Sequence, residues 1–555
     1  MNVTKIPESR REAWKRLDSD TFDLFVIGGG ITGAGIALDA ASRGMKTALV
    51  EMQDFAAGTS SRSTKLVHGG LRYLKQFEIG LVAEVGRERA IVYGNGPHVT
   101  TPEMMVLPIH KGGTFGKLST SIGLMVYDFL AAVKRGERRR MLGAQETLRR
   151  EPLLRQDGLL GAGYYVEYRT DDARLTLEVM KRAAEEGAAA LNYVAAERFL
   201  YEGGRIIGAA VRDALTGETT EVRAAVVINA AGPWVDRLRE MDGSRQGKQL
   251  RLTKGIHLVF DGERFPLRQA IYFDTPDKRM IFAIPRAGKT YVGTTDTFYE
   301  GDPAAPAMTE EERGYLLAAV NDMFPEVKLG AADVESSWAG VRPLIYEEGK
   351  NPSEISRKDE VWQSPSGLVT IAGGKLTGYR KMAETVVDLA ARKLRESGGR
   401  AFPACRTKML PISGGDVGGP DAFPAFVDRQ AAEAVRCGLT EEQGKRLAQT
   451  YGSNVSRLFA IAADAKHRAA AERHGLPLDL YAAAVYAVQE EMALKPVDVL
   501  IRRTGALLFR IDHVRQYGGQ VVALMAELLG WSDATRRAYA SELETELASA
   551  VTPRG

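Results

Sequence analysis

Three glycines and one glutamate near the N-terminus have the residue types and the spacing needed to hold a dinucleotide. Gly28, Gly30 and Gly33 form a G-x-G-x-x-G pattern, and Glu51 follows 23 residues after the first of them. In this pattern the first glycine permits a tight turn, the second lets the backbone approach a pyrophosphate, and the third allows close helix packing. Glu51 is expected to accept hydrogen bonds from the hydroxyl groups of an adenosine ribose.

The elements that must position these residues are also visible in the sequence. An apolar run at 24–27 predicts a strand before the glycines, a helix follows them, and a second strand is expected at 47–50. A glycine pattern alone is weak, because glycine-rich turns occur in unrelated α/β folds. The order strand, turn, helix, strand and acidic residue favours a dinucleotide-binding unit.

The stretch that follows indicates FAD rather than NAD. Residues 58–73, GTSSRSTKLVHGGLRY, continue with hydroxyl and cationic side chains where an NAD domain would add further strands and helices. Such side chains can line the FAD pyrophosphate and reach toward the isoalloxazine ring. A serine-rich surface loop is the alternative on composition alone.

A second glycine turn lies near residue 374. Gly373, Gly374 and Lys375 follow an apolar strand-like run and precede a run with helical periodicity. A nucleotide-triphosphate loop is excluded, because Val369 and Leu376 occupy the positions that such a loop gives to glycine and to Ser or Thr. A helix N-terminus attracts anions, so this turn is expected to face a negatively charged group.

The bulk composition sets limits on the class of protein. A chain of 555 residues is expected to form two or three domains. Its 74 Lys and Arg nearly balance 71 Asp and Glu, which gives no electrostatic reason to expect nucleic acid as a partner. Cys405 and Cys437 are too few for a disulfide framework or a metal cluster and suit a reducing cytosol. The charged first twenty residues lack a secretory signal, and no apolar run is long enough to cross a bilayer.

The order of signals predicts interleaved domains. We expect an FAD-binding domain from 20–102, 150–250 and 345–400, because buried parallel strands recur at 225–229 and 368–371. A substrate domain is expected from 103–149 and 251–344. After a glycine-rich linker, the segment 415–550 is rich in Ala, Leu, Glu and Arg and predicts a separate helical cap.

Several segments together resemble the FAD-dependent sn-glycerol-3-phosphate dehydrogenases of the aerobic, respiratory type. IGGGITGAGIALDAASRG at 27–44 and GGKLTGYRKMA at 373–383 are similar to the two diagnostic segments of that family. SSRSTKLVHGGLRYL, DDARL, NAAGPW, KGIHLV, VGTTD and GVRPL resemble its other blocks in family order, and EMALKPVDVLIRRTGALL resembles its helical cap. The resemblance spans residues 23–508 and implies an α/β fold in which a Rossmann-like domain is interleaved with an antiparallel-sheet substrate domain.

The resemblance implies oxidation of glycerol 3-phosphate to dihydroxyacetone phosphate, with hydride transfer from C2 to flavin N5 and electron delivery to a membrane quinone. Catalytic roles carry over to His257, Arg342 and Lys375. Substrate contacts carry over to Arg72, Tyr73, Thr295 and Arg357. Together with the motifs above, the expected cofactor contacts are Gly28, Gly30, Gly33, Glu51, Thr59, Ser60, Ser61, Lys65, His68, Gly232, Gly373, Gly374, Leu376 and Thr377.

The chemistry of the reaction explains these residue types but leaves some roles open. A base must take the hydroxyl proton, and fixed cations must hold the phosphate. Arg suits the phosphate best, because its planar guanidinium group can donate two parallel hydrogen bonds. His257 matches the family histidine, while His68 is the rival base or a cofactor contact. These catalytic and binding roles have structural alternatives. The histidine can be a hydrogen-bonded structural residue, Arg342 a surface arginine, and the threonines ordinary strand residues. The glycine turn with Lys375 is expected to stabilise negative charge at the N1/C2 edge of the flavin.

The remaining expectations concern partners and location. An apolar run at 122–133 precedes Lys134, Arg135 and Arg138–Arg140, which fits either a lipid contact or an internal helix followed by a charged loop. A cytoplasmic protein at the inner face of the membrane is expected, and a homodimer is one possible assembly. The rival functions are an α-glycerophosphate oxidase that uses oxygen, a flavin oxidase of amines or amino acids, and a non-catalytic FAD-binding protein. No long inserted segment is visible of the kind that favours the oxidase.

Overall fold

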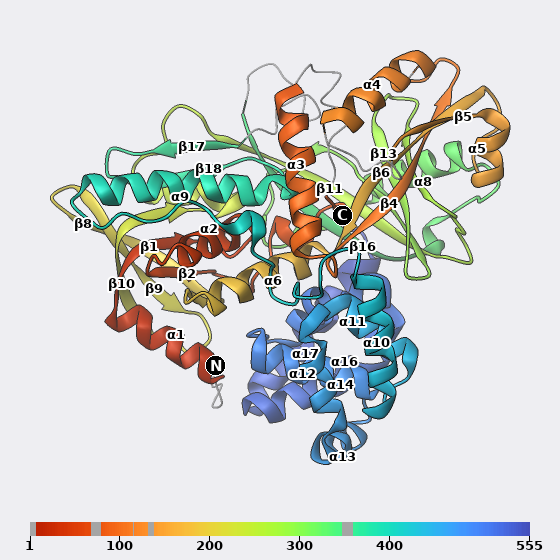
Figure 1. Cartoon of the computed structure of the whole chain (residues 1–555). Coiled ribbons are helices and arrows are strands. Elements are labelled where there is room, and N and C mark those ends of the chain that lie inside the picture. The colour runs from red at the N-terminus through yellow and green to blue at the C-terminus, as the bar shows by residue number, and fades with distance from the viewer. Residues whose placement is uncertain (1–6, 68–78, 115, 131–137, 347–358, 555) are drawn as a thin grey trace.

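The computed structural model describes residues 7–67, 79–114, 116–130, 138–346 and 359–554. Figure 1 shows three parts: a layered α/β region, a second β-rich region beside it, and a cluster of C-terminal helices, in blue, packed below both. The chain passes between the first two regions several times before it enters the third. The expected mixed α/β fold with a C-terminal helical domain is confirmed.

The first sheet has the strand order β17-β18-β10-β1-β2-β7. The neighbouring strands from β18 to β7 are parallel, whereas β17 and the β8–β9 hairpin join in antiparallel fashion. Several of the parallel strands are short apolar runs, such as TALV in β2, whose four residues are all buried. The strands are β1 (Thr21–Ile27), β2 (Thr47–Val50), β7 (Ala189–Leu191), β8 (Val194–Glu202), β9 (Arg205–Asp213), β10 (Thr219–Asn229), β17 (Glu360–Gln363) and β18 (Val369–Ala372).

Helices cover both faces of this sheet. On one face α2 (Ile31–Ser42) packs with α6 (Asp172–Glu185) and α9 (Tyr379–Glu396) over Leu24 and Val26 of β1. On the other face α1 (Glu8–Ser19) packs with Phe22 and Phe25. A short helix, α7 (Val235–Met241), follows β10. This three-layer arrangement brings the carboxyl ends of β1, β2, β10 and β18 to one edge, which is where ligands bind in open parallel sheets.

The second sheet has ten strands in the order β15-β11-β14-β13-β12-β4-β6-β3, with β16 paired to β11 and β5 paired to β6. Its pairs are antiparallel except for β12 and β4. The strands are β3 (Leu66–Val67), β4 (Thr100–His110), β5 (Arg140–Gly143), β6 (Leu159–Thr170), β11 (Leu250–Asp261), β12 (Ala270–Asp274), β13 (Met280–Arg286), β14 (Lys289–Gly293), β15 (Thr297–Phe298) and β16 (Val334–Ile345). The accompanying helices are α3 (Ile79–Asn95), α4 (Lys117–Leu130), α5 (Ala144–Arg150) and α8 (Glu310–Met323).

Two expected boundaries differ from the structure, because β3 and the first residues of β4, expected in the cofactor domain over 20–102, pair with β6 in the second sheet. The segment 150–250 was expected in the cofactor domain, but β6 belongs to the second sheet. It pairs along its whole length with β4, from Thr100 opposite Thr170 to His110 opposite Leu159. This long antiparallel ladder fixes both strands in one sheet, so the chain returns to the cofactor domain only at α6.

The C-terminal part is helical, as the composition indicates. Its helices are α10 (Phe423–Arg436), α11 (Glu441–Tyr451), α12 (Val455–Ala463), α13 (Ala465–His474), α14 (Leu478–Glu490), α15 (Ala506–Phe509), α16 (Ile511–Leu529) and α17 (Asp533–Val551). A π-helical segment, η9 (Asp498–Arg503), precedes α15. Thr440, Asp464 and Ser532 accept hydrogen bonds from the first turns of the helices that they precede, which explains where those helices begin. Throughout the described ranges, helices are too short or too polar to span a bilayer.

Candidate active site

The first glycine turn leaves no room for side chains. Gly28 has a φ of 121°, and a Cβ atom there would lie 2.4 Å from the carbonyl oxygen of Ala230. A Cβ atom on Gly33 would lie 1.8 Å from the carbonyl oxygen of Gly28. Gly30 directly precedes α2, whose first N–H, on Ile31, donates to Ser60 Oγ at 2.9 Å. The bare backbone of Gly28 and Gly30 therefore faces the cavity at a helix N-terminus, as a pyrophosphate site requires.

Glu51 closes the same end of the site. Its two carboxylate oxygens accept hydrogen bonds from the N–H groups of Gly29, at 2.7 Å, and Gln53, at 2.8 Å. Burial raises the pKa of this carboxyl, although both backbone donors act to lower it. The side chain is thus held in one orientation on the cavity wall at the end of β2, where a ribose would lie.

A single cavity of about 700 Å³ joins this nucleotide end to the second sheet. It runs between Glu51 at the edge of the first sheet and Arg342 on β16 of the second. Among the residues expected to bind cofactor or substrate, its walls contain Gly28, Gly30, Glu51, Thr59, Ser60, Gly232, Arg342, Gly373, Gly374, Lys375, Leu376 and Thr377. His68, Arg72, Tyr73 and Arg357 lie outside the described residues.

Four expected contacts stand behind the wall instead of on it. Gly33 packs against the glycine turn, and the Ser61 carbonyl accepts from the ammonium group of Lys65 at 3.0 Å. That ammonium group also pairs with Asp172 at 2.6 Å, because a buried cation requires a counter-charge. Thr295 is buried, and its hydroxyl accepts from the N–H of Ile256 at 3.0 Å. In this structure these residues support the site from behind.

Arg342 projects from β16 into the cavity. Its guanidinium group donates to Thr294 Oγ1 at 2.9 Å and to Asp296 at 3.3 Å. Gly255 on the neighbouring strand makes room for it, since a Cβ atom there would lie 2.3 Å from Arg342 Nη2. This role of Gly255 was not predicted from the sequence, although a glycine inside a strand often marks such a close approach.

His257 lies on β11 next to the cavity but is almost completely buried, at 1% exposure. Its imidazole ring stacks on the indole of Trp338, with 4.5 Å between ring centroids and 9° between planes. His257 Nε2 is 3.0 Å from the hydroxyl oxygen of Thr64, which does line the cavity. Burial is the largest cause that holds the pKa of His257 well below its usual value, and the nearby positive charges of Arg342 and Lys65 lower it further. The ring is therefore neutral at physiological pH.

Thr64 and Arg62 are cavity residues that the sequence analysis did not single out. Both lie in the hydroxyl-rich run after the first glycine turn, and that run was the only available signal. The guanidinium group of Arg62 donates to the carbonyl oxygen of Ala304 at 3.2 Å. Burial lowers the pKa of Arg62. The two residues extend the polar wall from the nucleotide end toward Arg342.

The second glycine turn joins β18 to the helix that follows it. Gly373 and Gly374 have φ values of 77° and 86°, a region that favours glycine. A 3-10 turn, Leu376–Gly378, then leads into α9. Lys375, Leu376 and Thr377 line the cavity next to the turn, so the expected glycine turn before a helix is present at the cavity wall.

The fold and this site define an FAD-dependent oxidoreductase. The family model described as FAD dependent oxidoreductase matches residues 23–380, and the model described as the C-terminal domain of alpha-glycerophosphate oxidase matches residues 405–536. The chain is 60% identical to an aerobic glycerol-3-phosphate dehydrogenase of Bacillus subtilis, over 96% of each chain. It is 59% identical to one of Staphylococcus aureus, over 98% of this chain and 97% of the other. The protein belongs to the aerobic glycerol-3-phosphate dehydrogenase family within that wider class.

A solved structure supports the same assignment. The glycerol-3-phosphate dehydrogenase from Bacillus halodurans, described as complexed with FAD, superposes with a TM-score of 0.86 and 49% identity, covering 99% of each chain. The cavity fits this cofactor: its nucleotide end has bare glycine backbone and an oriented Glu51, and its other end has Lys375 beside the second glycine turn. FAD is the cofactor of this protein.

Proposed function

We propose that the protein oxidises sn-glycerol 3-phosphate to dihydroxyacetone phosphate. The observation that carries the proposal is one cavity with a nucleotide cradle at one end and Arg342, Lys375 and the Thr64–His257 pair at the other. Bound FAD supplies the acceptor for the C2 hydride at its N5 atom. The names of the relatives, at about 60% identity over nearly the full chain, support this substrate.

The phosphate needs fixed cations because it carries nearly two negative charges at pH 7. Arg342 is one such cation, and its contacts to Thr294 and Asp296 orient its guanidinium group toward the cavity. Arg72 and Arg357 would complete the binding set, with Tyr73 as a further substrate contact. Lys375 would contact the substrate oxygens or the cofactor, and backbone N–H groups of the second glycine turn would stabilise negative charge that develops beside it.

Proton removal is assigned to His257 acting through Thr64. The substrate C2 hydroxyl gives its proton to Thr64 Oγ1, while the proton of that threonine passes to His257 Nε2. The low pKa of His257 keeps the imidazole neutral before the reaction, and in the tautomer with the proton on Nδ1 its Nε2 atom accepts from the Thr64 hydroxyl. His68 is the rival base, in which case the Thr64–His257 pair would only shape the wall.

A quinone at a membrane surface is the proposed electron acceptor. Leu118, Ile122 and Met125 expose 75%, 50% and 52% of their surface on α4. Their spacing puts them on one side of that helix, and the basic residues Arg138 and Arg140 follow it. Exposed apolar side chains next to positive charge suit the cytoplasmic face of an anionic membrane.

An α-glycerophosphate oxidase is the second candidate function, because the C-terminal segment matches a domain model named for such an enzyme. One experiment tests both functions. The yellow holoenzyme is mixed anaerobically with glycerol 3-phosphate, and the bleached protein is then exposed to oxygen or to a quinone analogue. Rapid reoxidation by the quinone and slow reoxidation by oxygen support the dehydrogenase. Rapid reoxidation by oxygen supports the oxidase, and absence of bleaching contradicts both.

A further inference from the structure

A short loop, residues 51–56, separates the first glycine turn from the C-terminal domain. Glu51 and Phe55 pack against Gly29, where a Cβ atom would lie 2.7 Å from Glu51 Cβ and 2.8 Å from Phe55 Cδ1. The N–H of Ala56 donates to the carbonyl oxygen of Gly29 at 3.1 Å. The loop therefore supports the glycine turn from behind and carries Glu51, the residue placed for the ribose.

Asp54 connects this loop to the C-terminal domain, more than 400 positions further along the chain. Its carboxylate is fully buried and accepts hydrogen bonds from Arg502 Nε at 2.5 Å and from Arg503 Nη2 at 2.9 Å. Asn192 Nδ2 donates to the same carboxylate at 2.8 Å. Although burial acts to raise it, the two guanidinium groups hold the pKa of Asp54 below its usual value. The carboxylate is charged, and its charge is balanced by the other domain.

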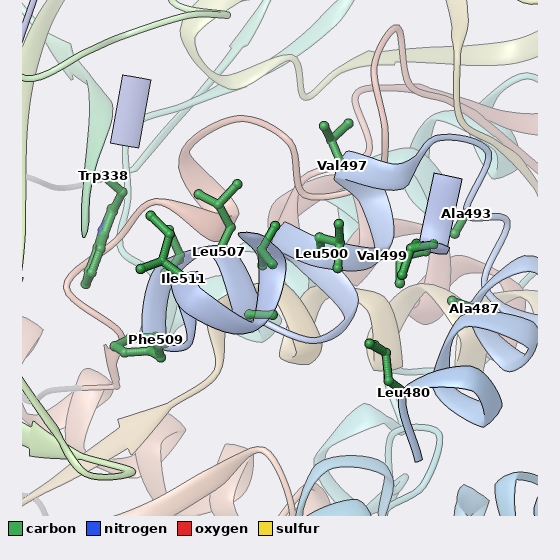
Figure 2. Close-up of a cluster of buried hydrophobic side chains, with 14 of the residues drawn as sticks. Trp338, Leu480, Ala487, Ala493, Val497, Val499, Leu500, Leu507, Phe509 and Ile511 are labelled. Carbon is green, nitrogen blue, oxygen red and sulfur yellow. The ribbon is translucent and has the colours of Figure 1, made fainter. Parts of the chain in front are cut away.

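The two arginines are fixed from their own side as well. Arg502 donates to Asp498 at 2.5 Å, and Arg503 donates to the carbonyl oxygen of Glu491 at 2.6 Å. Apolar side chains of the same segment, Val499 and Leu500, point into the helical domain (Figure 2). The segment thus has one side anchored in the core of the C-terminal domain and one side directed at Asp54.

We infer that the C-terminal domain positions the adenosine end of the FAD site, with Arg502 and Arg503 acting through Asp54 as positioning residues. This role goes beyond the proposed reaction and does not depend on it. A buried carboxylate between two buried guanidinium groups is costly to separate, so the loop has one favoured conformation while the domain is docked. FAD then binds a loop that is already ordered, so the free energy of binding does not include the entropic cost of ordering the loop. By linkage, FAD must stabilise the docked domain to the same degree.

The direct test is an Asp54→Asn substitution in the full chain. The amide keeps the volume of the carboxylate but removes its charge, so both arginines lose the counter-charge that the loop supplies, while Arg502 keeps its pairing with Asp498. The matched control is Asp479→Asn, which removes a carboxylate paired to Arg446, at 2.5 Å, inside the C-terminal domain. FAD release from each holoenzyme is measured by the rise in flavin fluorescence after dilution, and the FAD Kd by titration.

We expect the FAD Kd of Asp54→Asn to rise at least tenfold, which corresponds to about 1.4 kcal/mol, with a faster release rate. Asp479→Asn should stay within about twofold of wild type on the same scale. An Asp54→Asn Kd within twofold of wild type, in a protein that is folded by circular dichroism, overturns the inference. An equal rise in both variants also overturns it, because the effect would then be general loosening.

A second measurement needs no substitution and covers the case in which Asp54→Asn fails to fold. Hydrogen exchange is compared in the wild-type chain saturated with FAD and depleted of FAD. Residues 491–503 should exchange more slowly when FAD is bound, although they lie outside the cavity wall. Protection confined to the glycine turns and the residues of the cavity wall, with none in 491–503, contradicts the coupling.

Discussion

The imidazole of His257 lies one hydrogen bond behind the cavity wall, with its Nε2 atom 3.0 Å from the hydroxyl oxygen of Thr64. Thr64 lines the cavity, whereas the His257 side chain on β11 is buried and stacks on the indole of Trp338. A base in this position is protected from water and remains neutral, but it reaches a substrate only through the threonine. The relationship makes Thr64 as important to the proposed reaction as the histidine.

Replacing Thr64 with valine should therefore slow anaerobic flavin reduction by roughly 100-fold, the lower range for loss of general base catalysis. Valine keeps the shape but has no hydroxyl group to pass the proton. Thr64→Ser should retain most of the rate. Thr120→Val, at a buried threonine of α4 that is not part of the cavity wall, is the control. Rates of Thr64→Val and wild type within twofold would assign the base role to His68.

Arg342→Ala should leave FAD bound but weaken flavin reduction by glycerol 3-phosphate. Loss of one charge-assisted contact to the phosphate or the C2 oxygen costs about 1.5–3 kcal/mol, which raises the substrate concentration for half-maximal reduction by roughly 10- to 100-fold. Arg155→Ala, which removes an arginine paired with Asp322 away from the cavity, is the matched control. Near wild-type reduction by Arg342→Ala would remove this residue from the site.

Stability should fall as the pH drops below about 6.5, and His98 allows this to be measured. Burial, with positive charge from Lys181 and Arg174, lowers the pKa of His98 to about 3. The folded protein therefore keeps this ring neutral while the unfolded chain, with a pKa of about 6.5, takes up a proton. Between pH 7 and pH 5 the native state should lose about 2 kcal/mol from this residue alone.

The measurement is chemical unfolding of wild type and His98→Asn at pH 7 and pH 5. The variant is expected to be less stable at pH 7 but to show a smaller loss on acidification. His474→Asn, at a residue that pairs with Glu527 on the surface, is the control. An identical pH dependence in wild type and His98→Asn would show that His98 is not the source.

Membrane contact through α4 gives a fourth prediction. A triple replacement of Leu118, Ile122 and Met125 by serine should reduce co-sedimentation with anionic lipid vesicles several-fold, because it removes the apolar surface that would enter the lipid. Met409→Ser with Val435→Ser, at exposed apolar residues elsewhere, is the control. Equal sedimentation of all variants, together with no loss when Arg138 and Arg140 are neutralised, would end the membrane proposal for α4.

The nucleotide end of the site was predictable because local sequence determines it. The surroundings of Gly28 and Gly33 leave no space for a Cβ atom, so only glycine fits and the pattern can be recognised in the sequence. Glu51 is similarly fixed by the strand that it ends. These residues are close in sequence, and a short βαβ unit brings them together without help from the rest of the chain.

The other end was harder to predict because long-range pairing creates it. Strand β6 was expected in the cofactor domain, yet its ladder with β4 places it in the second sheet. Lys65 was expected at the cofactor, but its ammonium group pairs with Asp172, 107 positions later. Thr64 gains its importance only from His257 on a distant strand. Such roles depend on which distant segments pack together, and a single sequence does not indicate these long-range contacts.

In the proposed reaction, this cavity oxidises the C2 hydroxyl of glycerol 3-phosphate and reduces bound FAD. This reaction is tested by a single anaerobic turnover of the holoenzyme, in which flavin reduction is monitored by absorbance and the product is then assayed. We expect complete bleaching with one dihydroxyacetone phosphate formed per flavin, and almost no bleaching by glycerol, which lacks the phosphate that Arg342 is proposed to bind. Bleaching by glycerol at the same concentration and rate, or no bleaching by glycerol 3-phosphate, would show that the cavity does not select this substrate.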